Sequence, residues 1–106
     1  MNAPADISAA GGSRFRIDGM LDFDTVPLLM KQARQLFASV SDSVQVDFAG
    51  VTGCNSAGLA LLLEMAREMK RQNKSIQFLN MPKHIRTFAE AYAVADELEA
   101  AGLLQA

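Results

Sequence analysis

Residues 44–63 read VQVDFAGVTGCNSAGLALLL, and this stretch decides the fold. Its first part alternates apolar and polar side chains from Val44 to Phe48, which is the period-2 pattern of a half-buried strand. Two glycines then predict a short turn over residues 50–53. Strong helix formers follow Asn55, so the stretch predicts a strand, a turn and the start of a helix.

Two polar residues, Asn55 and Ser56, stand at the predicted start of this helix. A short side-chain oxygen there accepts a hydrogen bond from the free N–H groups of the first helical turn, so both residues are predicted N-caps. The positive end of the helix dipole also favours an anion or a phosphate at this place. Ser56 therefore has two compatible interpretations, as a structural cap and as a site of phosphorylation or partner recognition.

The composition is that of an ordinary globular protein. The chain has 106 residues, half of them hydrophobic, and a net charge of −2. We expect one domain over residues 1–106, and the mild acidity argues against nucleic acid as a partner. Cys54 is the only cysteine, and no metal-type spacing with histidine exists, so neither a disulfide nor a metal site is predicted.

No signal peptide and no run of about 18 apolar residues is visible in the sequence. These absences predict a cytoplasmic protein. Such a protein would reach a membrane only indirectly, by docking on a membrane protein.

The N-terminal part predicts a hairpin. Residues 1–12 are expected to be frayed or to form a short edge strand around Ile7, with a turn at Gly11–Gly12. Alternation from Arg14 onward predicts a second strand, which ends at Gly19. The other predicted elements are a helix from Asp24 or Thr25 to Ser39 or Val40, a strand at 75–79, a helix opened by Pro82 and a short helix at 95–101.

The order strand, strand, helix, strand, helix, strand, helix predicts an α/β fold. Its two strand–helix–strand crossovers imply parallel pairing, and the first hairpin makes the sheet mixed. Gln45 and Asp47 indicate that one face of the sheet is less covered than the other. We therefore expect a mixed sheet of four to five strands with helices mainly on one face.

The helix after Ser56 is expected to run to about Gln72. Its apolar stripe is predicted to consist of Leu59, Leu62, Leu63, Ala66 and Met69. Leu61 falls on the opposite side of the helical wheel, which Ala57, Ala60 and Glu64 share. It is either a scattered surface residue or part of a small apolar patch that receives a partner helix.

Three other polar residues have structural interpretations. Asp47 is expected to have a solvent-face or turn-capping role, because aspartate is disfavoured inside strands. Cys54 is expected to be a small, partly buried thiol, and His84 a surface residue. The sequence contains no triad, paired carboxylates or phosphate-binding glycine loop, so no catalytic residue and no cofactor are predicted.

The segment DFAGVTGCNSAGLALLL, residues 47–63, resembles the signature segment of STAS domains, the family of anti-sigma-factor antagonists. IDGMLD, residues 17–22, also resembles the STAS pattern, and the similarity extends from about Arg14 to Leu98. This resemblance implies a binding module with the fold given above. In such antagonists the hydroxyl that matches Ser56 is phosphorylated by a partner kinase, and the added charge of about −1.5 to −2 would release the complex.

Two residues depart from this pattern. Asn55 replaces the family's aspartate, and Ala57 lacks a second hydroxyl often found there. Both differences favour a binding role over phosphorylation.

The segment NSAGLALLLE, residues 55–64, together with Pro82 and RTFAE at 86–90, is similar to the STAS subunit of the Mla phospholipid-transport system of Gram-negative bacteria. The similarity implies an accessory subunit without chemistry of its own, which binds and stabilises the ATPase subunit of an ABC transporter at the inner face of the inner membrane. The alternative is an anti-sigma-factor antagonist that binds an anti-sigma kinase and is switched by phosphorylation of Ser56. The predicted partner-binding residues are Asn55, Ser56, Ala57, Gly58, Ala60, Leu61 and Glu64.

Overall fold

A computed structural model describes residues 5–91, which form one four-stranded sheet and three helices. The elements in chain order are β1 (Asp6–Ala9), β2 (Arg14–Leu21), α1 (Val26–Phe37), β3 (Ser43–Cys54), α2 (Ser56–Arg71), β4 (Ser75–Leu79) and α3 (Lys83–Ala91). The strands lie in the order β1-β2-β3-β4; β1 is antiparallel to β2, and the other two pairings are parallel.

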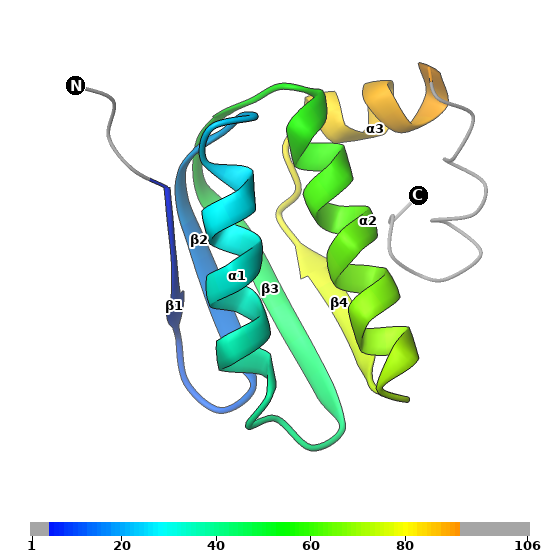
Figure 1. Cartoon of the computed structure of the whole chain (residues 1–106). Helices are drawn as coiled ribbons and strands as arrows, with labels where there is room; N and C mark the ends of the chain where they lie inside the picture. Colours follow the sequence, from blue (N-terminus) through cyan, green and yellow to red (C-terminus); the bar gives the residue numbers. More distant parts are fainter. Residues whose placement is uncertain (1–4, 92–106) are drawn as a thin grey trace.

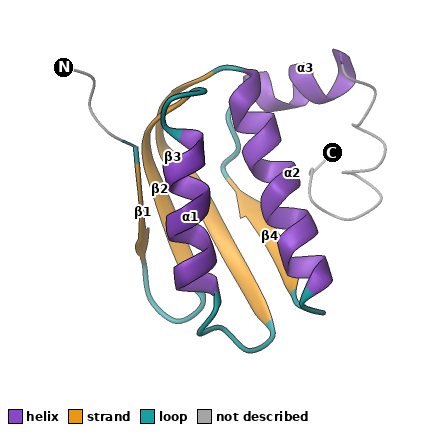
Figure 2. Ribbon diagram, viewed as in Figure 1, coloured by secondary structure: helices purple, strands orange, loops and turns teal. Residues whose placement is uncertain are grey.

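Helices α1 and α2 lie side by side over one face of this sheet (Figures 1 and 2). The predicted α/β class, the mixed sheet and the one-sided helices are confirmed. The short helix predicted at 95–101 lies outside the described residues. Within residues 5–91 no helix is long and apolar enough to cross a membrane.

The N-terminal hairpin forms as predicted. β1 contains Ile7, and the turn places Gly11 at φ 106° and Gly12 at φ 58°, backbone conformations that favour glycine. The N–H of Arg14 donates to the carbonyl of Gly11 at 3.0 Å and closes the turn. The prediction of a short edge strand for this segment is thus confirmed.

Both central strands extend beyond their predicted ends. β2 continues past Gly19, and β3 runs straight through residues 50–53, so the turn predicted there is wrong. The pairing of β2 with β3 shifts register twice here, between Arg16 and Asp18 and again between Gly19 and Met20. A Cβ atom on Gly50 would stand 2.9 Å from the carbonyl oxygen of Ile17, so this glycine allows two strands to approach closely and does not reverse the chain.

α1 begins after Thr25 as predicted and ends at Phe37, before the predicted Ser39 or Val40. The hydroxyl of Thr25 makes no capping bond; it donates to the carbonyl of Met20 at 2.7 Å. The turn that precedes α1 is therefore tied back to the end of β2.

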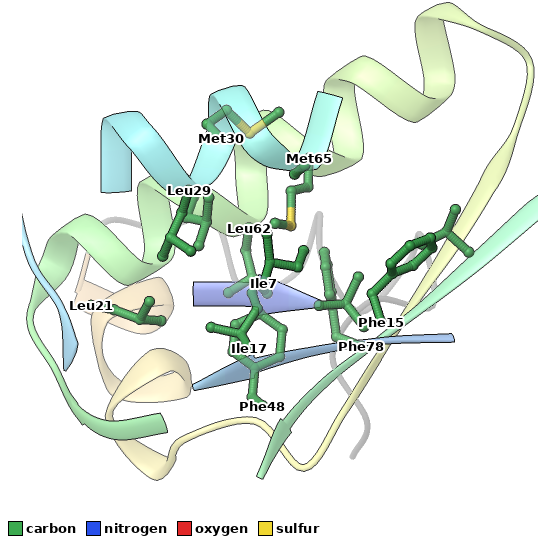
Figure 3. Packing of buried hydrophobic residues seen from close by; sticks show 14 of the residues in the cluster. Ile7, Phe15, Ile17, Leu21, Leu29, Met30, Phe48, Leu62, Met65 and Phe78 are labelled. Atoms are coloured by element: carbon green, nitrogen blue, oxygen red, sulfur yellow. The ribbon is translucent and has the colours of Figure 1, made fainter. Parts of the chain in front are cut away.

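The core lies between the helices and the covered face of the sheet. Figure 3 shows Leu29 of α1 and Leu62 and Met65 of α2 above Ile17 and Phe48 of the central strands. Two edge-to-face aromatic pairs, Phe15–Phe37 and Phe48–Phe78, have ring centroids 5.2 and 5.7 Å apart. This core fixes α2 on the sheet and thereby positions its first turn.

Candidate protein-binding site

The predicted site lies where β3 passes into α2, at the carboxyl edge of the parallel strands. The N–H of Asn55 donates to the carbonyl of Leu21 at 3.0 Å, which holds the start of α2 against the end of β2. Asn55 has an extended backbone, and its Oδ1 accepts from the N–H of Ala57 at 2.8 Å. Asn55 is thus the N-cap of α2, as predicted, and it fills this role without a charge.

Ser56 is the first residue of α2 and is partly exposed. The N-cap role predicted for Ser56 is wrong, because Asn55 supplies the capping oxygen and Ser56 is already the first residue inside α2. The hydroxyl of Ser56 therefore lies at the positive end of α2, where it is partly exposed to solvent.

The predicted placement of Leu61 on the exposed side of α2 is wrong, because its side chain is fully buried. Ala57 and Gly58 are buried as well, whereas Ala60 and Glu64 are exposed. The helix is rotated relative to the prediction, so that Met65 joins the buried face while Leu63 and Ala66 are only half-buried. Residues 57–63 are all apolar or glycine. A helical wheel of this segment therefore contains no polar residue that would indicate which side of the helix faces solvent.

Glu68 of α2 is a charged residue that is largely buried, with only 9% of the residue exposed. Its carboxylate forms an ion pair with Arg71 and lies 3.9 Å from Nε of Arg34 on α1. The same Arg34 lies 3.8 Å from Glu64. These contacts link α1 to α2 and leave Glu64 at the exposed end of the cluster.

Cys54 is partly buried, as predicted, at the end of β3. Its Sγ donates to the carbonyl of Asn55 at 3.1 Å. Burial raises the pKa of the thiol, so Cys54 is not an activated nucleophile.

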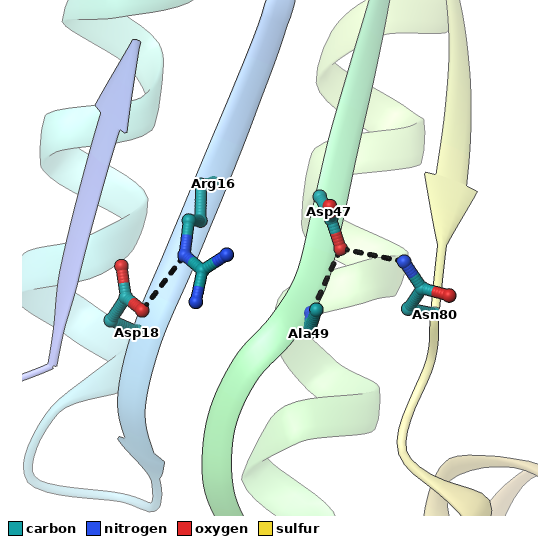
Figure 4. A network of polar contacts seen from close by, with 5 residues as sticks. All are labelled: Arg16, Asp18, Asp47, Ala49 and Asn80. Atoms are coloured by element: carbon teal, nitrogen blue, oxygen red, sulfur yellow. Dashed lines mark hydrogen bonds and ion pairs between the residues drawn. The ribbon is translucent and has the colours of Figure 1, made fainter. Parts of the chain in front are cut away.

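The face of the sheet turned away from the helices is polar (Figure 4). Asp47 accepts from the N–H of Ala49 at 2.8 Å and from the amide of Asn80 at 3.0 Å. The bond from Asn80, followed by the bond from Ala49, lowers the pKa of the Asp47 carboxyl. On the neighbouring strand, Arg16 pairs with Asp18 at 3.0 Å. The solvent-face role predicted for Asp47 is confirmed, whereas the turn-capping alternative is wrong because Asp47 lies within β3. Its partner Asn80 was not predicted.

A second group that was not foreseen is an exposed apolar set at the end of β2 and the start of α1, namely Met20, Phe23 and Leu28. A signal for it exists in the sequence: Phe23 stands between two aspartates just before the predicted helix, where an aromatic side chain is not part of an apolar stripe. His84 is exposed, as predicted, and its ring stacks on Phe88 with centroids 6.3 Å apart. Among residues 5–91 no three His, Cys, Asp or Glu side chains gather as a metal site would require.

These features define an α/β domain that presents an uncharged helix N-terminus at one edge of its sheet. The profile of the family described as "Mlab, STAS domain" matches residues 7–105, and the protein belongs to this STAS-domain family. The predicted resemblance to STAS domains is thereby confirmed.

Two solved structures are similar in fold. The anti-sigma factor antagonist SpoIIAA in its unphosphorylated form superposes with a TM-score of 0.64 at 15% identity, over 95% of this chain and 99% of that chain. The Bacillus cell fate determinant SpoIIAA in the phosphorylated form gives a TM-score of 0.63 at 17% identity, over 87% of this chain and 86% of that chain. A search of curated proteins found no match.

Proposed function

We propose that this protein is a non-catalytic accessory subunit that binds and stabilises the ATPase of an ABC-type phospholipid transporter of the Mla kind. The ATPase supplies the chemistry, so the proposal requires no catalytic residue and no cofactor. Binding to that complex would hold the protein at the inner face of the inner membrane. Membership of the family described as "Mlab, STAS domain" supports this proposal.

The observation that carries the proposal is the exposed stripe of α2. Ser56, Ala60 and Glu64 recur at every fourth residue, so their side chains lie along one line of the helix surface. All three are at least partly exposed, and Asn55 stands at the head of the line. We call Asn55, Ser56, Ala60 and Glu64 the α2 stripe.

The α2 stripe suits contact with another protein. Ala60 is small, so a partner backbone or helix can approach α2 closely beside it. Asn55 and Ser56 offer hydrogen-bonding groups without a charge that would have to be desolvated. The buried residues Leu61, Ala57 and Gly58 support the stripe from below and are no part of its surface.

A second candidate is an anti-sigma-factor antagonist that binds a kinase and is switched by phosphorylation of Ser56. One specific observation favours it: Ser56 is a partly exposed hydroxyl at a helix N-terminus, a place where a phosphate is electrostatically stabilised. Asn55 in place of an acidic residue favours the transporter subunit instead.

The test is a binding titration with the purified ATPase subunit of the Mla-type transporter of the same organism. Ser56→Asp should weaken binding by about tenfold or more, because a carboxylate would be desolvated in the contact. Ser56→Ala, which adds no charge, should bind within a few-fold of the wild type. Ser8→Asp adds the same charge on the exposed side of β1 and serves as the matched control.

Unchanged binding by Ser56→Asp would place the interface elsewhere on the protein. Mass spectrometry of the protein from its native host tests the second candidate. Phosphorylated Ser56, together with binding to a kinase and not to the ATPase, would replace the transporter role with the regulatory one.

A further inference from the structure

Three large hydrophobic side chains are exposed in the part of the chain that the structure describes, and all three lie between Met20 and Leu28. Met20 is 38% exposed, Phe23 69% and Leu28 54%. A single exposed apolar residue is common on protein surfaces. Three such residues grouped within nine positions of the chain instead indicate an interaction site. Met20 lies near the end of β2, Phe23 in the turn that follows, and Leu28 in the first turn of α1.

This turn is held in one conformation. The carboxylate of Asp22 accepts from the N–H groups of Asp24 at 2.8 Å and Thr25 at 2.9 Å. The hydroxyl of Thr25 in turn accepts from the N–H of Asp22 at 3.0 Å and donates to the carbonyl of Met20. Phe23 therefore stands at the tip of a fixed turn, and burying its ring against a partner would cost little additional backbone entropy.

The turn is continuous with the α2 stripe. Met20 pairs with Gly53 in the sheet, and a Cβ atom on Gly53 would stand only 2.6 Å from the sulfur of Met20. The next pair in the register is Leu21 with Cys54. Directly after it, the N–H of Asn55 donates to the carbonyl of Leu21. The turn and the first residues of α2 thus belong to one edge of the sheet.

We propose that Phe23 is an aromatic anchor that enters an apolar pocket on the same protein partner that contacts the α2 stripe. This inference rests on the proposed function, because it takes the ATPase subunit as that partner. Aromatic side chains that are buried at the centre of an interface contribute much of its binding energy. Asp22 and the exposed Asp24 flank Phe23, so the rim of the pocket carries a basic side chain.

The experiment measures the affinity of the purified ATPase subunit for the wild type, Phe23→Ser and Ser56→Asp. Phe23→Ser should weaken binding by at least about tenfold, the size of loss found when an aromatic anchor is truncated. It should leave the thermal unfolding midpoint nearly unchanged, since the side chain is exposed. Gln77→Ser, on the exposed side of β4, is the matched control and should bind like the wild type.

The Asp24→Asn variant tests whether the rim of the partner's pocket carries a basic side chain. It should slow association a few-fold at low salt, and the difference should shrink at high salt. Equal association rates at low salt would overturn the basic rim.

The other outcomes separate the two proposals. If Ser56→Asp weakens binding and Phe23→Ser does not, the proposed function stands and the anchor is overturned. If the wild type does not bind the ATPase, both proposals fall. If the wild type forms a dimer in light scattering and Phe23→Ser is monomeric, a second copy of the chain covers Phe23, and the anchor toward the ATPase is overturned.

Discussion

At the scale of single residues, Leu61 and its neighbours show how sharply the environment changes along α2. It occupies the core, while the residue before it, Ala60, is exposed on the α2 stripe. Leu63, two positions further on, is only half-buried. Three neighbouring apolar residues of one helix thus have three different environments, and the effects of truncating them should differ accordingly.

We expect Leu61→Ala to destabilise the fold by roughly 2–5 kcal/mol, because it leaves a cavity between α2 and the sheet. Leu63→Ala removes the same atoms from a half-buried position and should cost clearly less. Urea denaturation followed by circular dichroism measures both changes. Equal midpoints for the two variants would contradict the orientation of α2 described above.

At the scale of elements, the packing of α3 against the first turn of α2 depends on a glycine. A Cβ atom on Gly58 would collide with the sulfur of Cys54 and stand 3.1 Å from Cδ1 of Ile85 on α3. Gly58 is therefore needed for the close approach of three elements, β3, α2 and α3. Ile85 itself is fully buried.

Gly58→Ala should accordingly destabilise the protein by about 1–3 kcal/mol through overpacking, and the better helix propensity of alanine offsets only part of this. Combining it with Cys54→Ala removes the colliding sulfur and should recover much of the loss. A double-mutant cycle of unfolding free energies measures this coupling. Strictly additive effects would show that the sulfur is not the obstacle.

At the scale of the whole molecule, the two central strands have partners on both sides, whereas β1 is a four-residue strand paired only with β2 in the described sheet. Local opening takes place where few backbone hydrogen bonds and contacts must be broken. The stability of the fold should therefore be unevenly distributed across the sheet.

Native-state hydrogen exchange tests this expectation. Amides of β1 should exchange through local opening at a lower free energy than the amides of Val44–Phe48 in β3, which should require global unfolding. Equally slow exchange in both strands would show that β1 belongs to the most stable part of the protein.

The sequence was sufficient to predict the order of the elements and a mixed sheet with parallel crossovers, because strand and helix periodicities are strong in this chain. It was not sufficient at Gly50, where a glycine that permits strands to approach looks the same as a glycine in a turn. It also failed at Leu61, because a helix that is apolar on most sides does not reveal which side faces the sheet. Among the site residues, the capping role of Asn55 was predictable from local rules. The exposure of Phe23 was indicated only by its two flanking aspartates, and its place beside α2 depends on tertiary structure.

The raised pKa of Cys54 has a practical consequence for labelling the protein. The chain has no other cysteine, and at neutral pH this half-buried one remains a poorly reactive thiol. A cysteine introduced at Ser8, on the exposed side of β1, would therefore take up a maleimide dye selectively. A fluorophore attached there would lie on the uncovered face of the sheet and report on a docking partner without standing between that partner and α2.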